Sequence, residues 1–517
     1  MKMTAALALA LLATAAAAQP AQGSAQGPAE TATRAAVARI AALNPRINAV
    51  RAVDPTAIDQ AQTLDRLRMA RGPLYGLPIL IKDNIDAKGP LPTTAGSLAL
   101  KDNVTNRDAP LVAGLRRAGA IIVGKTNLSE WANMRGDRSI SGWSGIGGQV
   151  RNPHALNRTP CGSSSGSGAA VAAGMVDAAI GTETDGSITC PAAVNGIVGL
   201  KPTVGLVSRT HIIPISASQD TAGPMTKDVR TAALLLTAIA GSDPADAATA
   251  TADAHRADYL AALDRQALKG VRIGVMRFAA RFSAPVTVVF ERALEVLKAQ
   301  GAILVDVEAP KDREQIGAAE YLVLVTELKA GLNAYLATTP PNVKVRTLAD
   351  AIAFNIANGP RELGLFGQQA FTLAESTKGL DDPDYVKARA LSLRLAGKDG
   401  IDAMLAAGNV VALVAPTAAP AWFIDASTGD RASGGGAGTF AAVAGYPHLT
   451  VPMGTVQGLP VGLSFLGPAW SEARLLGLGY AYEQASKAMV APTFAESVET
   501  MPAMAPLLAP FSAPDRR

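Results

Sequence analysis

Apolar residues recur at regular intervals in the first part of the chain and predict a helix followed by a buried strand. Over residues 58–67 every third position is apolar, which is typical of one face of an amphipathic helix. Gly72 and Pro73 follow, and this pair predicts that the helix has ended before them. The continuous apolar run at residues 79–81 then predicts a buried strand, with Lys82 at its exit.

The same alternation continues further along the chain. Residues 108–127 predict a helix that ends near Gly119 and a second buried strand at 121–123, and so complete a βαβ unit. Two strand-like, glycine-punctuated stretches follow Gly174. From Lys227 to Leu405 helical patterns dominate, with strands predicted in "VRIGVM" and "AILVDV", before the apolar run "VVALVAPT". The pattern predicts an α/β protein without internal repeats.

Composition supports a globular protein and excludes some partners. Hydrophobic residues make up 49% of the 517 residues and charged residues only 17%, so the chain has ample material for a core and is not disordered overall. The formal net charge is +4. Because the sequence holds no block of Lys and Arg residues, we expect no nucleic-acid partner.

The two ends of the chain are predicted to lie outside the folded domain. Residues 1–18 contain one lysine, then an apolar run and small residues, the layout of a cleaved secretory signal peptide. We therefore expect an exported protein, periplasmic or secreted, with no membrane-spanning segment after the leader. The folded domain is predicted at 28–500, with a mobile loop at "ASGGGAG" and a disordered tail at 501–517.

Cysteine and histidine residues are too few to suggest a disulfide scaffold or a metal site. The chain has two cysteines, Cys161 and Cys190, which leave open either one bridge or two thiols. Its four histidines have no spacing typical of metal ligands. We expect no metal and no other cofactor.

The stretch "TPCGSSSGSGAAVAAG" at 159–174 is the first candidate for chemistry. It is no phosphate-binding loop, because no lysine follows its glycines. It does satisfy the G-x-S-x-G pattern of a nucleophile elbow, with Ser164 at the centre and His448 downstream as a possible partner. However, an elbow requires a strand running directly into the first glycine, and the preceding "RNPHALNRTPC" is not strand-like.

Several blocks of the sequence together resemble the amidase signature family. The blocks are "GLPILIKDNID", "CGSSSGSGAAVAAG", "GTETDGSITCPAAVNGIVGLKPTVGLVS" and "SQDTAGPM", dense from about 74 to 225, and then "AGYPHLTVPMG" and "GLPVGLSFLGP". Three segments are similar to sequences of the peptide amidase branch, namely "EWAN", "SGWSGIGGQVRNP" and "GTETDG". The resemblance implies a single large α/β domain, with a mixed sheet of many strands flanked by helices.

The resemblance also implies a Ser-Ser-Lys catalytic triad. Its lysine falls on Lys82, its bridging serine on Ser163 and its nucleophile on Ser187. In the family the bridging serine follows a cis peptide bond. A serine hydroxyl needs a neighbouring base, and a lysine serves as one only while it is neutral, so Lys82 must be desolvated.

The residues before the nucleophile are the candidates for an oxyanion hole. The backbone N–H groups of Thr184, Asp185 and Gly186 are expected to hold the developing negative charge. Three positions depart from the family wording "GTDTGGSIR": Glu183 and Asp185 replace Asp and Gly, and Thr189 replaces Arg. Three further polar residues could support the site, namely Asn133, Ser164 and Thr182.

These observations predict hydrolysis of a carboxamide through a serine acyl-enzyme. The expected substrate is a small-molecule or peptide amide, with the C-terminal carboxamide of a peptide favoured and ammonia released. Four alternatives stay open: a broad acylamidase, the amidotransferase subunit that remodels misacylated tRNA, a non-catalytic binding subunit, and an α/β-hydrolase that uses Ser164.

Overall fold

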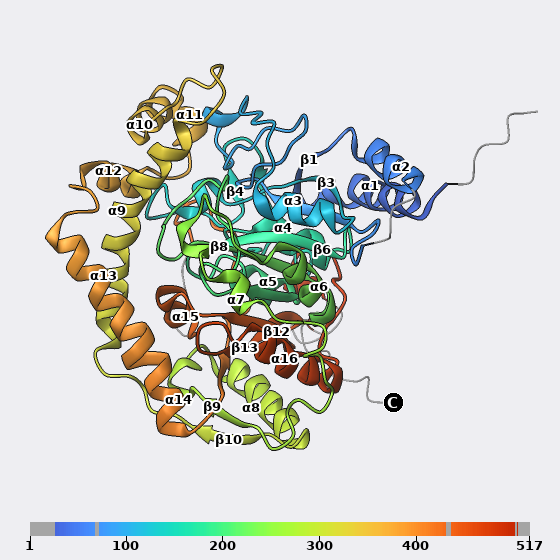
Figure 1. The fold of residues 1–517 in the computed structure, drawn as a ribbon, viewed down its shortest axis with the longest axis vertical. Coiled ribbons are helices and arrows are strands. Elements are labelled where there is room, and N and C mark those ends of the chain that lie inside the picture. The colour runs from blue at the N-terminus through green and yellow to red at the C-terminus, as the bar shows by residue number, and fades with distance from the viewer. Residues whose placement is uncertain (1–25, 68–71, 431–435, 502–503, 505–517) are drawn as a thin grey trace, which may run out of the picture.

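Eleven strands form one sheet, in the order β1-β3-β2-β6-β8-β7-β12-β13-β11-β9-β10 (Figure 1). The computed structural model describes residues 26–67, 72–430, 436–501 and 504. The strands of this sheet are β1 (Val50–Val53), β2 (Pro78–Lys82), β3 (Ile121–Thr126), β6 (Ala178–Glu183), β7 (Val198–Lys201), β8 (Thr221–Thr226), β9 (Arg272–Val275), β10 (Ile303–Asp306), β11 (Ala412–Pro416), β12 (His448–Val456) and β13 (Leu459–Leu466). The short strands β4 (Trp143–Ser144) and β5 (Gly148–Gln149) pair separately.

The sheet is mixed, as expected. Strand β2 runs parallel to both β3 and β6, and β9 runs parallel to both β10 and β11. The remaining neighbours are antiparallel, including the β12–β13 hairpin. The carboxyl ends of β2 and β6 therefore lie at the same edge of the sheet, and the segments that follow them build the site described below.

Helices cover both faces of the sheet, and more helices lie beyond it. They are α1 (Pro28–Ile47), α2 (Ala57–Arg66), α3 (Pro110–Arg117), α4 (Ser165–Ala172), α5 (Thr189–Asn195), α6 (Val229–Ile239), α7 (Ala252–His255), α8 (Ala284–Ala299), α9 (Ile316–Leu336), α10 (Leu348–Ala357), α11 (Gly359–Glu362), α12 (Gln369–Ser376), α13 (Pro383–Ala396), α14 (Ala403–Gly408), α15 (Gly438–Ala444) and α16 (Glu472–Ser486).

Alternating side chains divide the core into layers. On β2, Ile79 and Ile81 belong to the apolar cluster that contains residues of α3, α6, α8 and α16, whereas Leu80 belongs to the cluster that contains residues of α1, α2, α4 and α5. Successive residues of a strand point to opposite faces. The continuous apolar run therefore reflects a strand that is covered on both sides.

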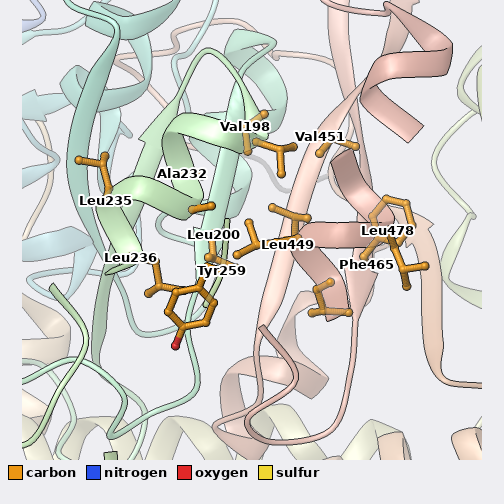
Figure 2. Packing of buried hydrophobic residues seen from close by; sticks show 14 of the residues in the cluster. Val198, Leu200, Ala232, Leu235, Leu236, Tyr259, Leu449, Val451, Phe465 and Leu478 are labelled. Atoms are coloured by element: carbon orange, nitrogen blue, oxygen red, sulfur yellow. The ribbon is translucent and has the colours of Figure 1, made fainter. Parts of the chain in front are cut away.

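Figure 2 shows the first of these layers at the centre of the sheet. Leu200 of β7 and Leu449 of β12 lie side by side on neighbouring strands, in register with each other. Leu236 of α6 and Leu478 of α16 belong to the same cluster. This packing joins the two halves of the sheet into one core.

Helices α9 to α13 form an arm along one side of the molecule (Figure 1). The arm has an apolar cluster of its own, which includes Leu328 and Phe371, and Trp131 from the main body packs into that cluster. Trp131 and Phe371 make an edge-to-face contact with ring centroids 5.5 Å apart. The arm is thus fixed to the segment that precedes Ser163.

Most of the local predictions are confirmed. The periodic helix corresponds to α2, the βαβ unit to β2-α3-β3, and the three later apolar runs to β9, β10 and β11. The region from 227 to 405 is mainly helical, as predicted. The proposed leader at 1–18, most of the tail and residues 432–435 of the proposed loop lie outside the described residues.

Candidate active site

Lys82 is the last residue of β2, and its side chain is fully buried. Its Nζ lies 2.7 Å from Ser163 Oγ, 2.8 Å from Thr182 Oγ1 and 3.2 Å from the Thr182 carbonyl oxygen. Burial lowers the pKa of Lys82 to about 7, although the nearby carboxylates of Asp220 and Glu183 act in the opposite direction. Lysine normally has a pKa of about 10.4. A large fraction of Lys82 is therefore neutral near pH 7, as a base requires.

Ser163 lies in the loop before α4, where its side chain is fully buried. The Gly162–Ser163 peptide bond is cis, which agrees with the family expectation. The possible bridge between Cys161 and Cys190 is present, with Cα atoms 6.0 Å apart. Because Cys190 lies in α5, the bridge ties the Ser163 loop to the segment that begins just after Ser187.

Ser187 lies in the turn between β6 and α5 and is 8% exposed. Its carbonyl oxygen accepts a hydrogen bond from the Ser164 backbone N–H at 3.1 Å, which brings the two serine-bearing segments together. Within the described residues its hydroxyl makes no hydrogen bond. That hydroxyl is therefore free to approach a ligand.

The turn that carries Ser187 presents backbone N–H groups without internal partners. Among the described residues, no acceptor engages the N–H groups of Thr184, Asp185 or Gly186. The Glu183 carboxylate instead accepts the N–H groups of Ile188 at 2.7 Å and Thr189 at 2.9 Å. These bonds hold the end of the turn in place, and the three preceding donors remain available to an oxyanion.

The elbow hypothesis for Ser164 is wrong. No strand runs into Gly162, and Ser164 is fully buried at the start of α4. Its hydroxyl donates to the Thr182 carbonyl at 3.0 Å and accepts from the Thr182 N–H at 3.2 Å. His448 Nε2 instead lies 2.7 Å from Ser464 Oγ. The Ser164 hydroxyl therefore stabilises β6 through these two hydrogen bonds and is not available as a nucleophile.

The other two polar candidates differ in their positions. Thr182 contacts Lys82 directly and also accepts a hydrogen bond from Asn84 Nδ2 at 3.0 Å. Asn133 Nδ2 donates to Ser141 Oγ at 3.4 Å. Thr182 thus belongs to the surroundings of the lysine, whereas the side-chain hydrogen bond of Asn133 stays within its own loop region.

Two cavities adjoin the serine-bearing segments. One, of about 30 Å³, is lined by Ser163, Thr182 and Thr184 together with apolar residues that include Ile213 and Ile215. The other, of about 310 Å³, is bounded by Asp185 and Gly186. The turn before Ser187 therefore contributes to the walls of both cavities.

Sequence reasoning missed several residues that support this turn. Thr184 Oγ1 donates to Asp220 Oδ1 at 2.5 Å, and Gln219 Nε2 donates to Glu320 Oε1 at 2.8 Å. Thr439 Oγ1 donates to Asp185 Oδ2 at 2.8 Å. Asp220 lies within the block "SQDTAGPM", so the sequence could have indicated it as a site residue. Glu320 and Thr439 come from distant helices and carry no local signal.

The described part of the chain has neither a metal-binding cluster nor a membrane-spanning helix. It contains no group of three or more His, Cys, Asp or Glu side chains arranged to hold a metal ion. No helix within it is both long and apolar enough to cross a bilayer.

A buried lysine in contact with a serine, beside a second serine at a turn with free N–H donors, defines a hydrolase site on this α/β fold. The family model described as Amidase matches residues 31–476. The chain belongs to this amidase family and is an amide-hydrolysing enzyme.

Individual relatives agree with this assignment. The structure of native peptide amidase from Stenotrophomonas maltophilia is 53% identical, with a TM-score of 0.85 over 90% of this chain and 95% of that chain. A probable amidase from Arabidopsis thaliana is 37% identical over 88% of this chain and 86% of its own length. A glutamyl-tRNA(Gln) amidotransferase subunit from Pseudomonas syringae is 36% identical over 88% of this chain and 93% of its own length.

Proposed function

We propose that this enzyme hydrolyses the C-terminal carboxamide of peptides through an acyl-enzyme on Ser187 and releases ammonia. The observation that carries the proposal is the 2.7 Å contact between a fully buried Lys82 Nζ and Ser163 Oγ, beside the turn that presents Ser187. A buried lysine of lowered pKa is suited to accept a proton near neutral pH.

The proton path follows the three side chains. Ser187 Oγ attacks the carbonyl carbon while its proton passes to Ser163 Oγ, and the Ser163 proton passes to neutral Lys82 Nζ. The tetrahedral intermediate then collapses, and the proton returns through Ser163 to the amide nitrogen, which leaves as ammonia. Water attacks the acyl-enzyme by the same path and releases the peptide acid, so that one amide and one water give one acid and one ammonia.

The oxyanion of the intermediate is assigned to the N–H groups of Thr184, Asp185 and Gly186. Donors of this kind lower the barrier by roughly 3–4 kcal/mol each where they have been removed singly. The Asp220 contact to Thr184 and the Glu183 contacts to Ile188 and Thr189 support this role, because they fix the turn before substrate arrives.

Similarity favours a peptide amide over the substrate of an amidotransferase. The chain is 53% identical to a peptide amidase and 36% identical to an amidotransferase subunit. The test is an ammonia-release assay that compares N-acetyl dipeptide amides with free glutamine, with mass spectrometry of the acid product. We expect rapid release from the peptide amides. Release from glutamine alone would contradict the proposal, and equal rates on aryl anilides would indicate a broad acylamidase.

We also propose that the enzyme is exported. The pattern of residues 1–18 supports this, and so does the Cys161–Cys190 bridge, since disulfides persist mainly in oxidising compartments. Cell fractionation with N-terminal sequencing of the mature protein tests it. A cytoplasmic protein that retains Met1 would contradict export.

A further inference from the structure

The cavity of about 310 Å³ bounded by residues on either side of Ser187 combines polar groups with aromatic walls. Gly186, Thr189 and Cys190, which flank Ser187 in the sequence, form one side of it. Phe282 and Trp422 also line it. A cavity of this size next to the nucleophile is large enough for an amino-acid side chain of the substrate.

His448 contributes a buried polar atom without a partner to this cavity. The residue is 1% exposed and lines the cavity, and its Nδ1 has no hydrogen-bond partner among the described residues. Its other ring nitrogen lies 2.7 Å from Ser464 Oγ. Leaving a buried polar atom unpaired is unfavourable. An occupant that forms a hydrogen bond with Nδ1 would remove this cost.

Gly438 keeps the space between His448 and Asp185 open. A Cβ atom built on Gly438 would lie 3.8 Å from His448 Nδ1 and 4.0 Å from Asp185 Oδ1. These are ordinary contact distances, so the glycine is not required by crowding. Its missing side chain leaves a passage between two polar atoms, the imidazole nitrogen and the carboxylate oxygen.

The ionisable groups around this passage are mainly carboxyl groups. Burial lowers the pKa of His448 to about 3, so the imidazole stays neutral, and burial raises the pKa of Asp185 to about 6. Asp185 therefore becomes ionised between mildly acidic and neutral pH. The other ionisable groups that act on it are Glu183 of β6, Glu320 of α9, whose pKa burial raises to about 8, and Lys201 of β7, whose pKa burial lowers to about 8.

We propose that this cavity receives the side chain of the residue that bears the scissile carboxamide, and that it selects a cationic side chain, Lys or Arg, over an anionic one. Asp185 supplies the opposite charge, and His448 Nδ1 is a further acceptor in the tautomer whose Nε2–H donates to Ser464. Phe282 and Trp422 supply aromatic faces, which attract cations as well as apolar stems. The inference rests on the proposed function, because it assigns the side-chain pocket of that same reaction.

The experiment compares N-acetyl amino-acid amides that differ only in the side chain. The series is arginine amide, its neutral analogue citrulline amide, glutamate amide and glycine amide, each measured as kcat/KM at pH 8. We expect arginine amide to exceed citrulline amide by about tenfold, since a charge-assisted hydrogen bond is roughly twice as strong as a neutral one. Glutamate amide should be the poorest of the series.

Two variants test the assignment of residues. Asp185→Asn should bring the ratio of arginine amide to citrulline amide close to one, and lowering the pH to 5 should reduce this ratio in the unmodified enzyme. Gly438→Ala should lower kcat/KM for arginine amide by a larger factor than for glycine amide, which has no side chain. The Gly438→Ala variant still tests the pocket assignment if the Asp185→Asn variant does not fold.

The outcomes separate this inference from the proposed function. If no peptide amide releases ammonia, the proposed function fails. If the four amides react but arginine amide and citrulline amide do so equally, or if their ratio survives Asp185→Asn and Gly438→Ala leaves arginine amide unaffected, the pocket assignment alone is overturned.

Discussion

Burial of Lys82 determines its protonation state and therefore its ability to act as a base. A lysine at the end of an exposed strand keeps its charge through neutral pH, whereas this one has no contact with solvent and three acceptor contacts. Desolvation disfavours the ammonium form more than the carboxylates of Asp220 and Glu183 favour it. The sequence shows only that this lysine follows an apolar run. Its burial and its three acceptor contacts depend on the fold.

The first prediction is that kcat/KM for a neutral peptide amide rises with pH, with a midpoint near pH 7. The pKa of Lys82 is lowered to about 7, so below that pH the side chain is protonated and cannot accept the Ser163 proton. Above it the base is free and the rate stays high. A midpoint close to pH 10, the value for an ordinary lysine, would contradict this mechanism. Lys82→Met should retain the fold by circular dichroism and lose about 10³–10⁴-fold in rate.

The second prediction distinguishes two serines. Ser187→Ala should abolish turnover, because it removes the attacking oxygen. Ser164→Ala should keep most of the activity and lower stability by about 1–2 kcal/mol, because it removes two buried hydrogen bonds to Thr182. Labelling with a serine-directed phosphonate and mapping the modified peptide provides the readout. An adduct on Ser164 would contradict the assignment.

Individual site residues were predictable to the extent that they lie in contiguous motifs. Lys82, Ser163 and Ser187 each belong to a block whose wording resembles the family, and the structure brings the first two into contact. His448 was considered only as an elbow partner, and its true neighbour, Ser464, lies on the next strand of a hairpin. Pairings across strands depend on register, which a single sequence does not display.

At the scale of elements, two short helices and their preceding loops build the site. Helix α4 follows Ser163 and α5 follows Ser187, and the bridge between Cys161 and Cys190 links the two segments across a sequence separation of 29. The bridge therefore restrains both serine-bearing segments relative to each other. The bridge reduces the conformational entropy of the unfolded chain and holds the two loops of the site in fixed relative positions.

The third prediction concerns this bridge. The double substitution Cys161→Ala with Cys190→Ala should lower the free energy of unfolding by about 3–4 kcal/mol, as the loop-closure model gives for a loop of this length. It should also reduce kcat more than KM, because the serines lose their mutual restraint. Denaturant unfolding and amidase assays measure both effects. The unmodified enzyme with a reducing agent is the control. An unchanged midpoint in both cases would contradict a stabilising bridge.

Elements with a strong local pattern were predicted, and those whose pattern depends on the whole sheet were not. Strands β2 and β3 are continuous apolar runs and were recognised. Strand β8 reads "TAGPMT", which has no apolar run and contains a proline. It becomes a strand because β6 and β7 pair with it on both sides. Tertiary context here overrides local propensity.

At the scale of the whole molecule, the site collects residues from distant parts of the chain. Asp185 precedes the nucleophile, Glu320 comes from the helical arm and Thr439 from α15. The sheet and the arm thus meet at one turn. The family resemblance predicted a large α/β domain, but it did not predict that the arm would place a carboxyl group near Asp185.

The final prediction is that the enzyme prefers peptide amides to monoamides of dicarboxylic acids, and that it spares internal peptide bonds. An arginine just beyond the nucleophile would recognise a carboxylate with two parallel hydrogen bonds. Here those positions are Thr189, whose N–H and hydroxyl bond Glu183, and Cys190, which is in the disulfide. Neither is charged, and Asp185 adds a negative charge at neutral pH.

A free carboxylate beside the scissile carbonyl is therefore repelled by Asp185 and has no cation to pair with. Binding it in a partly dry pocket is unfavourable by roughly several kcal/mol. The measurement is kcat/KM for malonamate, an N-acetyl dipeptide amide and the same dipeptide extended by one residue, all at pH 8. We expect the dipeptide amide to exceed malonamate by at least about 100-fold, since 1.4 kcal/mol corresponds to a factor of ten. The extended peptide, whose leaving group is larger than ammonia, should react least. Faster hydrolysis of malonamate would show that a cation from elsewhere serves the carboxylate, and the first residue to replace would then be Lys201.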